Sequence, residues 1–134
     1  RFNLEQKIFN DEIKIKDIPE LWNEEFKRLF NKTVDTDSNG CLQDVHWYAG
    51  LFGYFPTYSL GALTAAQLAS QLRIDITNLD TQIEKGDFTK LLQWLKTNVH
   101  SKASLYSTND ILQQVTNSNL NAKYFEDYIK NRYL

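Results

Sequence analysis

The sequence contains no methionine, a single cysteine and only two histidines. Its single cysteine, Cys41, cannot form an internal disulfide, which indicates a reducing compartment such as the cytoplasm, or a fold that needs no disulfide. Only two histidines occur, His46 and His100, and their spacing does not suit a zinc site made by this chain alone. Because natural reading frames begin with Met, we expect the chain starting at Arg1 to be processed, trimmed or a fragment.

Concentrated charge is also missing. The chain carries 15 basic and 17 acidic residues, for a net charge of −2, and has no basic patch, so we expect neither nucleic acid nor a membrane as a partner. It shows no secretory signal pattern. Charge is absent altogether from Val45 to Leu72, and this stretch is not a membrane span because Gly50, Gly53 and Pro56 interrupt it. We expect protein to cover it on both sides.

Helical periodicity dominates what is present, and no segment alternates convincingly like a strand. With 42% hydrophobic and 13% aromatic residues over 134 positions, the chain has enough apolar bulk for one core. We therefore expect an all-α fold with a single helical domain over residues 1–134. The predicted helices cover residues 1–11, 19–31, 57–73, 79–85, 88–99, 108–115 and 124 to the end.

Two local features of the charge-free stretch stand out. Small residues spaced four apart in the helix over 57–73 (Gly61, Ala65 and Ala69) would let another helix approach closely, so we expect this helix to be central. The segment 50–56 is predicted to be irregular, with glycines free to take positive φ. An irregular segment in a covered setting is a frequent place for a binding site.

The run Asp35-Thr36-Asp37-Ser38-Asn39-Gly40 matches the first half of a calcium-binding loop. Position 12 of that loop is His46, however, where calcium needs a bidentate carboxylate. The alternative is that an Asx-rich run simply forms turns. A calcium-binding helical module is therefore one alternative function.

The stretch from Gln43 to Trp47 offers different chemistry. If it is extended, Asp44 and His46 project to the same side, and Asp44 can hold one ring nitrogen of His46 and leave the other for a ligand. The alternative is a satisfied core histidine beside a packing Trp47. The single Cys41 could pair with His46 as a nucleophile, but an inert buried thiol is favoured. At a helix end, His100 is expected to cap carbonyl groups.

These residues also carry a resemblance to a known family. The run from Gly40 to Trp47 resembles the Gly-x-x-Gln-Asp-x-His-Trp signature of Taq-type metallocarboxypeptidases, and Gly53 to Tyr58 is similar to the Gly-Tyr-Phe-Pro-Thr-Tyr stretch that follows it there. Further similarities in family order extend the resemblance over essentially the whole chain: Leu21-Trp22-Asn23, Gly86-Asp87-Phe88, Leu91-Leu92-x-Trp94-Leu95 and Tyr124-Phe125-x-x-Tyr128.

The resemblance implies a zinc-dependent exopeptidase that removes single residues from peptide C-termini, with a helical cleft fold and commonly a homodimer. The family's His-Glu-x-x-His helix, its downstream Glu and its Ile-Arg-x-x-Ala-Asp motif lie upstream of the matched segment and are absent here. The chain is therefore expected to be the C-terminal part of such an enzyme. Zinc or another divalent metal would belong to the full-length parent, and the chain alone, without its N-terminal partner segment, is expected to be inactive.

Zinc-assisted attack on a peptide carbonyl develops an oxyanion that positioned hydrogen-bond donors stabilise. His46 and Tyr58 are the candidate catalytic donors, with Asp44 orienting His46. The candidate substrate-binding residues are Gln43, Asp44, Trp47 and Tyr54. The other alternative is a helical interaction domain without a catalytic site, in which His46 and the tyrosines belong only to the core.

Overall fold

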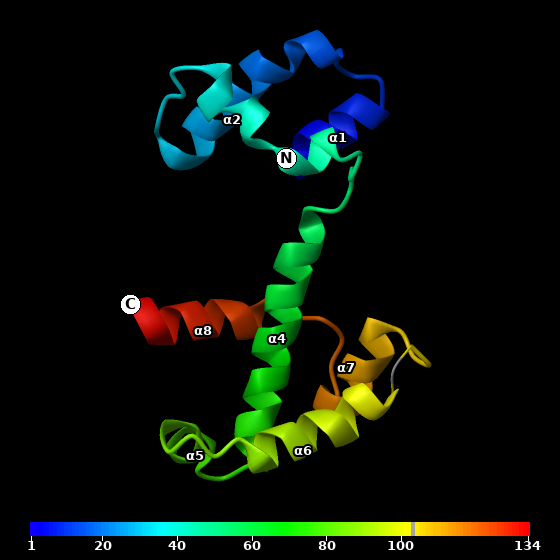
Figure 1. The fold of residues 1–134 in the computed structure, drawn as a ribbon, viewed down its shortest axis with the longest axis vertical. Coiled ribbons are helices and arrows are strands. Elements are labelled where there is room, and N and C mark those ends of the chain that lie inside the picture. Colours follow the sequence, from blue (N-terminus) through cyan, green and yellow to red (C-terminus); the bar gives the residue numbers. More distant parts are fainter. Residues whose placement is uncertain (103) are drawn as a thin grey trace. The chain divides into compact units, whose positions relative to one another are not determined.

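A computed structural model describes residues 1–102 and 104–134 of the chain. The described residues form α-helices and short 3-10 turns and contain no strand, which confirms the all-α expectation (Figure 1). They divide into two compact units, Arg1–Tyr58 and Ser59–Leu134. Each unit is described by itself, and the expectation of a single domain over the whole chain stays a prediction. None of the described helices is long and apolar enough to cross a membrane.

The first unit contains short helices joined by tight turns. Its α-helices are α1 (Phe2–Phe9), α2 (Ile18–Phe30) and α3 (Val45–Tyr48), and its 3-10 turns are η1 (Ile15–Asp17), η2 (Asp37–Asn39) and η3 (Cys41–Gln43). Helix α2 has Pro19 in its first turn, where a missing N–H costs nothing, and it ends at Asn31 with a left-handed φ of 53°. Asp17 precedes α2 at the cap position, but its carboxylate accepts from the backbone N–H of Lys14 (2.9 Å) and not from the N–H groups of the helix.

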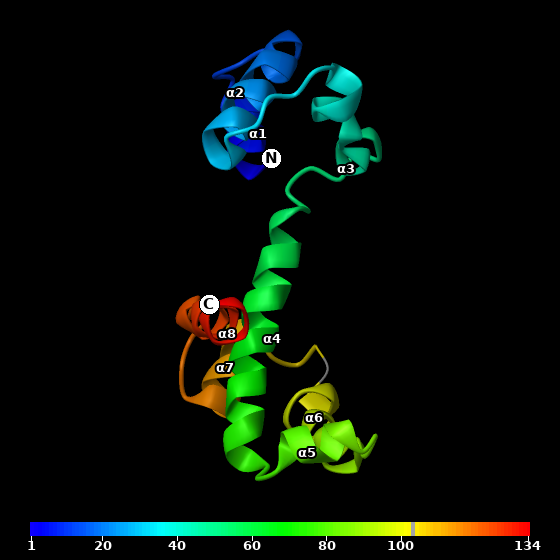
Figure 2. The same ribbon diagram turned by 90° about the vertical axis from the view of Figure 1, so that its left-hand side faces the viewer.

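The second unit is built on the long helix α4 (Pro56–Asp75), whose residues from Ser59 onward belong to it. The remaining elements are α5 (Leu79–Glu84), α6 (Thr89–Asn98), the 3-10 turn η4 (His100–Lys102), α7 (Thr108–Thr116) and α8 (Lys123–Tyr133). In both Figures 1 and 2, α8 lies beside α4, and α5 and α6 lie near the C-terminal end of α4. The predicted helices of this half are confirmed within a few residues.

Capping side chains account for several of these boundaries. Asp87 accepts from the backbone N–H of Thr89 (3.0 Å) at the start of α6, and Ser107 and Asp110 form a reciprocal capping box at the start of α7. At the other end of α6, the hydroxyl of Ser101 donates to the carbonyl of Thr97 (2.9 Å), a role that we expected of His100. The predicted loop over 100–107 begins instead with η4, and Ala103 lies outside the described residues.

The apolar core of the second unit lies where α4, α5 and α6 meet. Its buried members are Leu72, Ile76, Leu79 and Trp94. The indole N–H of Trp94 donates to the carboxylate of Asp75 (2.7 Å), so the one polar atom of this large side chain is paired.

The row of small residues on α4 is more open than predicted. Ala65 and Ala69 line a groove of about 820 Å³ between α4 and α8, with Tyr124 and Tyr128 on the opposite wall. A Cβ atom added at Gly61 would have no neighbour within 4 Å. Among the described residues, therefore, no helix is seated tightly at Gly61.

A buried amide holds the end of α7 against α4. Gln67 is fully buried, and its Nε2 donates to Thr116 Oγ1 (2.8 Å) and to the carbonyl of Asn119 (3.1 Å). Its Oε1 accepts from the backbone N–H of Asn121 (3.0 Å). One side chain thus satisfies polar groups of the turn that leads into α8, groups that burial would otherwise leave without water.

Replacing Gln67 by leucine keeps the volume and removes these hydrogen bonds. We expect a loss of about 1–3 kcal/mol in the free energy of unfolding, because several buried polar groups lose their partners together. Urea unfolding followed by circular dichroism measures this loss. Gln93→Leu is the matched control, since Gln93 is exposed on α6 and bonds only Thr97. Equal losses in the two variants would contradict the role assigned to Gln67.

Candidate active site

A histidine and a tyrosine that the sequence singled out lie together in the first unit. His46 projects from α3, and its Nε2 lies 3.2 Å from the hydroxyl oxygen of Tyr58, in the first turn of α4. Either group can donate, depending on the tautomer of the ring. The ring of Tyr54 stacks on that of His46, with centroids 5.5 Å apart and planes 21° apart, and Phe55 meets His46 edge-on. The structure therefore brings together His46, Tyr54 and Tyr58.

This pair remains accessible. The His46 side chain is 16% exposed, and Tyr54 and Tyr58 are 44% and 56% exposed. A core histidine with satisfied neighbours would be sealed from solvent on all sides. His46 is instead partly exposed and lies against two exposed tyrosines.

Asp44 determines where α3 begins. Its Oδ1 accepts from the backbone N–H groups of His46 (2.8 Å) and Trp47 (3.1 Å), as an N-cap aspartate does. The expected hydrogen bond from Asp44 to the His46 ring is not formed, since Oδ1 lies 3.6 Å from Nδ1, close enough for an electrostatic contact but beyond hydrogen-bond distance. The physical reason is that Val45 starts a helix, so the stretch is not extended and the carboxylate turns to the backbone.

The second oxygen of Asp44 is paired with a cation. Arg1 Nε lies 2.8 Å from Asp44 Oδ2, and the carboxylate is 1% exposed. The guanidinium also lies 4.1 Å from the centre of the Phe55 ring and 5.5 Å from that of Trp22. Asp44 is therefore enclosed by protein and its charge is compensated, which makes direct contact with a substrate unfavourable.

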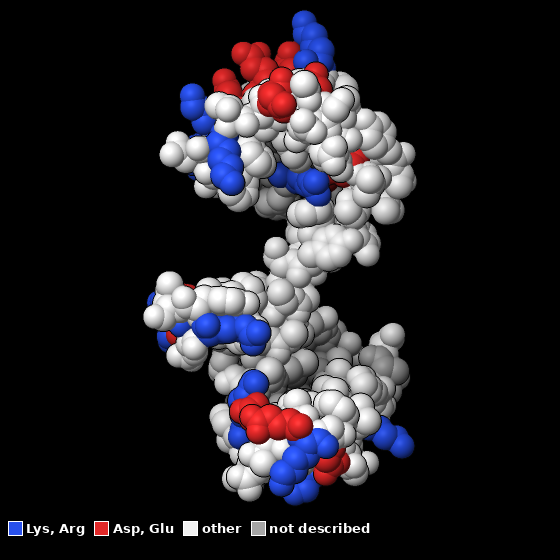
Figure 3. Space-filling model, turned by 60° about the vertical axis from the view of Figure 1, so that its left-hand side comes forward, with Lys and Arg blue, Asp and Glu red and all other residues white. Residues whose placement is uncertain are grey.

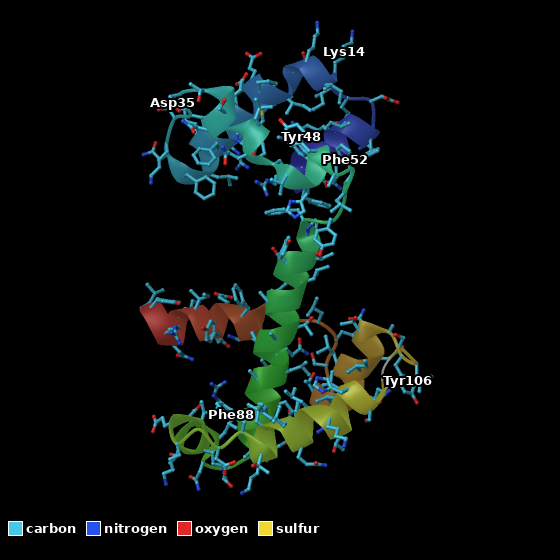
Figure 4. All side chains as sticks on the ribbon, viewed as in Figure 1. Lys14, Asp35, Tyr48, Phe52, Phe88 and Tyr106 are labelled. Carbon is cyan, nitrogen blue, oxygen red and sulfur yellow. The ribbon has the colours of Figure 1, made fainter. Side chains whose placement is uncertain are left out.

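A residue that sequence reasoning missed completes the support. Glu5, on α1, is 4% exposed; its Oε1 accepts from the indole N–H of Trp47 (2.7 Å) and its Oε2 from the backbone N–H of Gly53 (2.9 Å). Phe52, labelled in Figure 4, lies by α1 and meets Phe9 edge-on at 5.4 Å. The partners are 42 and 48 residues from Glu5 in the sequence, so no local pattern points to them.

The irregular segment after α3 follows the prediction. Gly50 and Gly53 have φ values of 71° and 73°, in the region that favours glycine. The backbone N–H of Leu51 donates to the carbonyl of His46 (2.8 Å), which closes the turn behind α3. The chain then enters α4 at Pro56, so Tyr54 and Tyr58 lie on either side of a helix start.

The other signature residues stabilise the turn before α3. A Cβ atom at Gly40 would lie 2.9 Å from Val34 Cγ1, so only glycine fits there without movement. Gln43 is exposed and donates from Nε2 to the carbonyl of Ser38. Trp47 packs between Trp22, edge-on at 5.9 Å, and the Phe52 ring.

The nucleophile and calcium alternatives find little support in the geometry. Burial raises the pKa of the Cys41 thiol, which disfavours the thiolate that a nucleophile needs. The carboxylate of Asp35 accepts from the Asn39 amide (3.0 Å) within its own turn. In residues 1–102 and 104–134 no three His, Cys, Asp or Glu side chains group to hold a metal ion.

On the face shown in Figure 3, acidic and basic side chains are interspersed within each unit.

Comparison with known proteins gives consistent matches. The family model described as Carboxypeptidase Taq (M32) metallopeptidase matches residues 1–133. Carboxypeptidase 1 of Bacillus subtilis is 40% identical over 133 residues, and thermostable carboxypeptidase 1 of Pyrococcus furiosus is 38% identical over 134 residues. The solved structure of the Pyrococcus furiosus carboxypeptidase superposes with a TM-score of 0.94 at 37% identity over 98% of this chain.

These matches cover only part of each relative. The chain accounts for 26% of the Bacillus subtilis protein and 27% of the Pyrococcus furiosus protein. The Trypanosoma cruzi metallocarboxypeptidase 1 structure, with a TM-score of 0.92 at 37% identity, is likewise covered over 28% of its chain. The chain therefore spans about a quarter of the length of the proteins it resembles.

The double role of Asp44 can be separated by two substitutions. Asp44→Ser keeps an oxygen that caps α3 but loses the ion pair, whereas Asp44→Ala loses both. We expect Asp44→Ala to be less stable than Asp44→Ser by about 1 kcal/mol, the usual contribution of an N-cap. Thermal or urea unfolding measures the difference, with the exposed Asp37→Ala as control. Identical stabilities for the two Asp44 variants would show that the cap contributes nothing.

Proposed function

Since the chain belongs to the Taq-type (M32) metallopeptidase family, we propose that it forms part of a metal-dependent carboxypeptidase and supplies residues of its substrate cleft. The activity proposed for the whole enzyme is the release of single residues from peptide C-termini. A homo-oligomer, suggested by the resemblance, and a cytoplasmic location, suggested by the lone cysteine, belong to the same proposal.

The observation that carries this proposal is the accessible pair of His46 and Tyr58, 3.2 Å apart. Cleavage of a peptide bond by water puts negative charge on the carbonyl oxygen, and the terminal residue of the substrate carries a second negative charge on its carboxylate. Both charges require hydrogen-bond donors fixed in position. In the tautomer with a proton on Nε2, the imidazole N–H donates to the phenol oxygen and leaves the Tyr58 O–H free to donate to either charge, with Tyr54 stacked behind the imidazole.

The remaining candidates divide by accessibility. Gln43 and Tyr54 are exposed and remain proposed substrate contacts. Asp44 and Trp47 direct their polar side-chain atoms into the protein, and we propose that they act on substrate through the structure they hold in place. Asp44 fixes the start of α3, and Trp47 connects that helix to Glu5.

The described residues of this chain do not fit a catalytic metal, because no cluster of suitable ligands occurs among them. The resemblance assigns the metal-binding His-Glu-x-x-His helix to a segment that precedes the matched one. We therefore propose that the metal, zinc or another divalent ion, is held by that N-terminal segment. The same segment is the proposed partner for apolar side chains that are exposed here, such as Val45 (69%) and Tyr48 (70%).

The isolated 134-residue chain is expected to release no C-terminal residues from a peptide, even with added zinc, because it lacks both the metal ligands and a general base. The measurement is release of free amino acid from a blocked dipeptide, with the full-length enzyme as the positive control. Zinc-dependent release by the purified chain would overturn the assignment of the metal site to another segment.

In the full-length enzyme, His46→Ala and Tyr58→Phe are each expected to lower kcat about a hundredfold or more, the usual effect of losing one donor to a developing oxyanion. Metal content and melting temperature should be close to those of the parent, because both side chains are partly exposed. Steady-state kinetics, metal analysis and thermal unfolding on the same preparations test this.

Tyr106→Phe is the matched control, since it also removes one phenol O–H and Tyr106 is 49% exposed in the second unit, apart from the His46 pair. It should retain the parent kcat. If the His46 and Tyr58 variants lose stability while turnover per folded molecule is unchanged, these residues are structural and the proposed role is wrong.

A further inference from the structure

We propose that Glu5 is a positioning residue. It bonds Trp47 and Gly53, the neighbours in sequence of His46 and Tyr54, and so keeps these two stacked rings in place beside Tyr58. This inference rests on the proposed function of that pair. The hydrogen bonds of Glu5 go to residues next to His46 and Tyr54, and not to the imidazole or to either phenol.

The position of its two partners carries the inference. Trp47, whose indole N–H donates to Oε1, directly follows His46 in the sequence. Gly53, whose backbone N–H donates to Oε2, directly precedes Tyr54. A single carboxylate therefore connects the residue beside the imidazole to the residue beside the ring stacked on it.

The carboxylate is well suited to fix both partners. It is 4% exposed, so water does not compete for its oxygens, and each oxygen has its own N–H donor at 2.7 or 2.9 Å. Hydrogen bonds to an ionised oxygen are short and about twice as strong as neutral ones. Displacing either donor would leave a buried charged oxygen without its partner, which is unfavourable by several times the thermal energy.

The segment that Glu5 holds needs such a contact. Between the end of α3 and Pro56 the backbone is not helical, and Gly50 and Gly53 both adopt positive φ, so the local backbone has more freedom than a helix would have. A displacement of about 1 Å in a catalytic group is enough to slow a reaction by about a hundredfold. Glu5 is therefore placed to limit movement of Tyr54 against His46.

The direct test is Glu5→Gln in the full-length enzyme. The amide has nearly the same shape, but it presents one oxygen and one NH2 group, so one of the two N–H partners must face a donor. We expect kcat per folded molecule to fall about tenfold to a hundredfold with little change in KM or metal content. The assay temperature is one at which circular dichroism shows every variant fully folded. Glu12→Gln, an exposed carboxylate that follows α1, is the control.

A second variant separates positioning from loss of stability. In Glu5→Gln combined with Trp47→Phe the indole N–H is gone, so the amide can turn its oxygen to Gly53 without opposing a donor. We expect kcat of the double variant to exceed that of Glu5→Gln alone. Trp47→Phe by itself should lower kcat less than Glu5→Gln, because Glu5 still bonds Gly53. If Glu5→Gln does not fold, Trp47→Phe takes its place in the test.

The outcomes distinguish this inference from the function on which it rests. If His46→Ala and Tyr58→Phe lower kcat but Glu5→Gln changes only the melting temperature, Glu5 is structural and the inference is wrong. Simple additivity of the Glu5 and Trp47 substitutions in log kcat would overturn it as well. If the His46 and Tyr58 variants retain full turnover, the proposed function itself fails, whatever Glu5→Gln does.

Discussion

Two buried carboxylates hold the first unit together where it has little regular structure. Asp44 and Glu5 are 1% and 4% exposed, and between them they accept from three backbone N–H groups and one indole N–H. A backbone that leaves helical geometry loses its own hydrogen-bond partners, and burial makes that loss expensive unless side chains replace them. The short helix α3 and the glycine-containing turn after it depend on this replacement.

Helix α1 and the residue that caps it, Arg1, contact both carboxylate-bonded turns. Arg1 pairs with Asp44, and Glu5, one turn further on, bonds Trp47 and Gly53. The second unit is stabilised differently, since α4, α5 and α6 share an apolar cluster around Leu72 and Trp94. Apolar packing tolerates small rearrangements, whereas an ionised oxygen facing a single N–H does not. The more restrictive kind of interaction lies beside the candidate site.

Sequence patterns predicted most of the fold, because helical periodicity and caps are local properties. The helix ranges of the second unit and the irregular segment with positive φ at Gly50 and Gly53 both follow from residues close in sequence. The sequence also singled out His46, Tyr54 and Tyr58, which the structure brings together, but not the residues that support them, and the roles of the three stay predictions. The expected hydrogen bond from Asp44 to the ring is not formed because a helix begins at Val45 and its backbone N–H groups bond the carboxylate. Glu5 was invisible because its partners lie 42 and 48 residues away.

The same contrast explains why the signature residues are polar although several of them are enclosed. A glycine at position 40 is required by the close approach of Val34, and an aspartate at 44 by the N–H groups at the start of α3. Each of these two residue types is thus required by the protein's own structure, without reference to a substrate. His46 alone among the signature side chains combines a ring nitrogen near a second donor with partial exposure. The other signature residues hold the backbone on both sides of this imidazole, and the hydrogen bonds of Glu5 to Trp47 and Gly53 reach the residue before the tyrosine stacked on it.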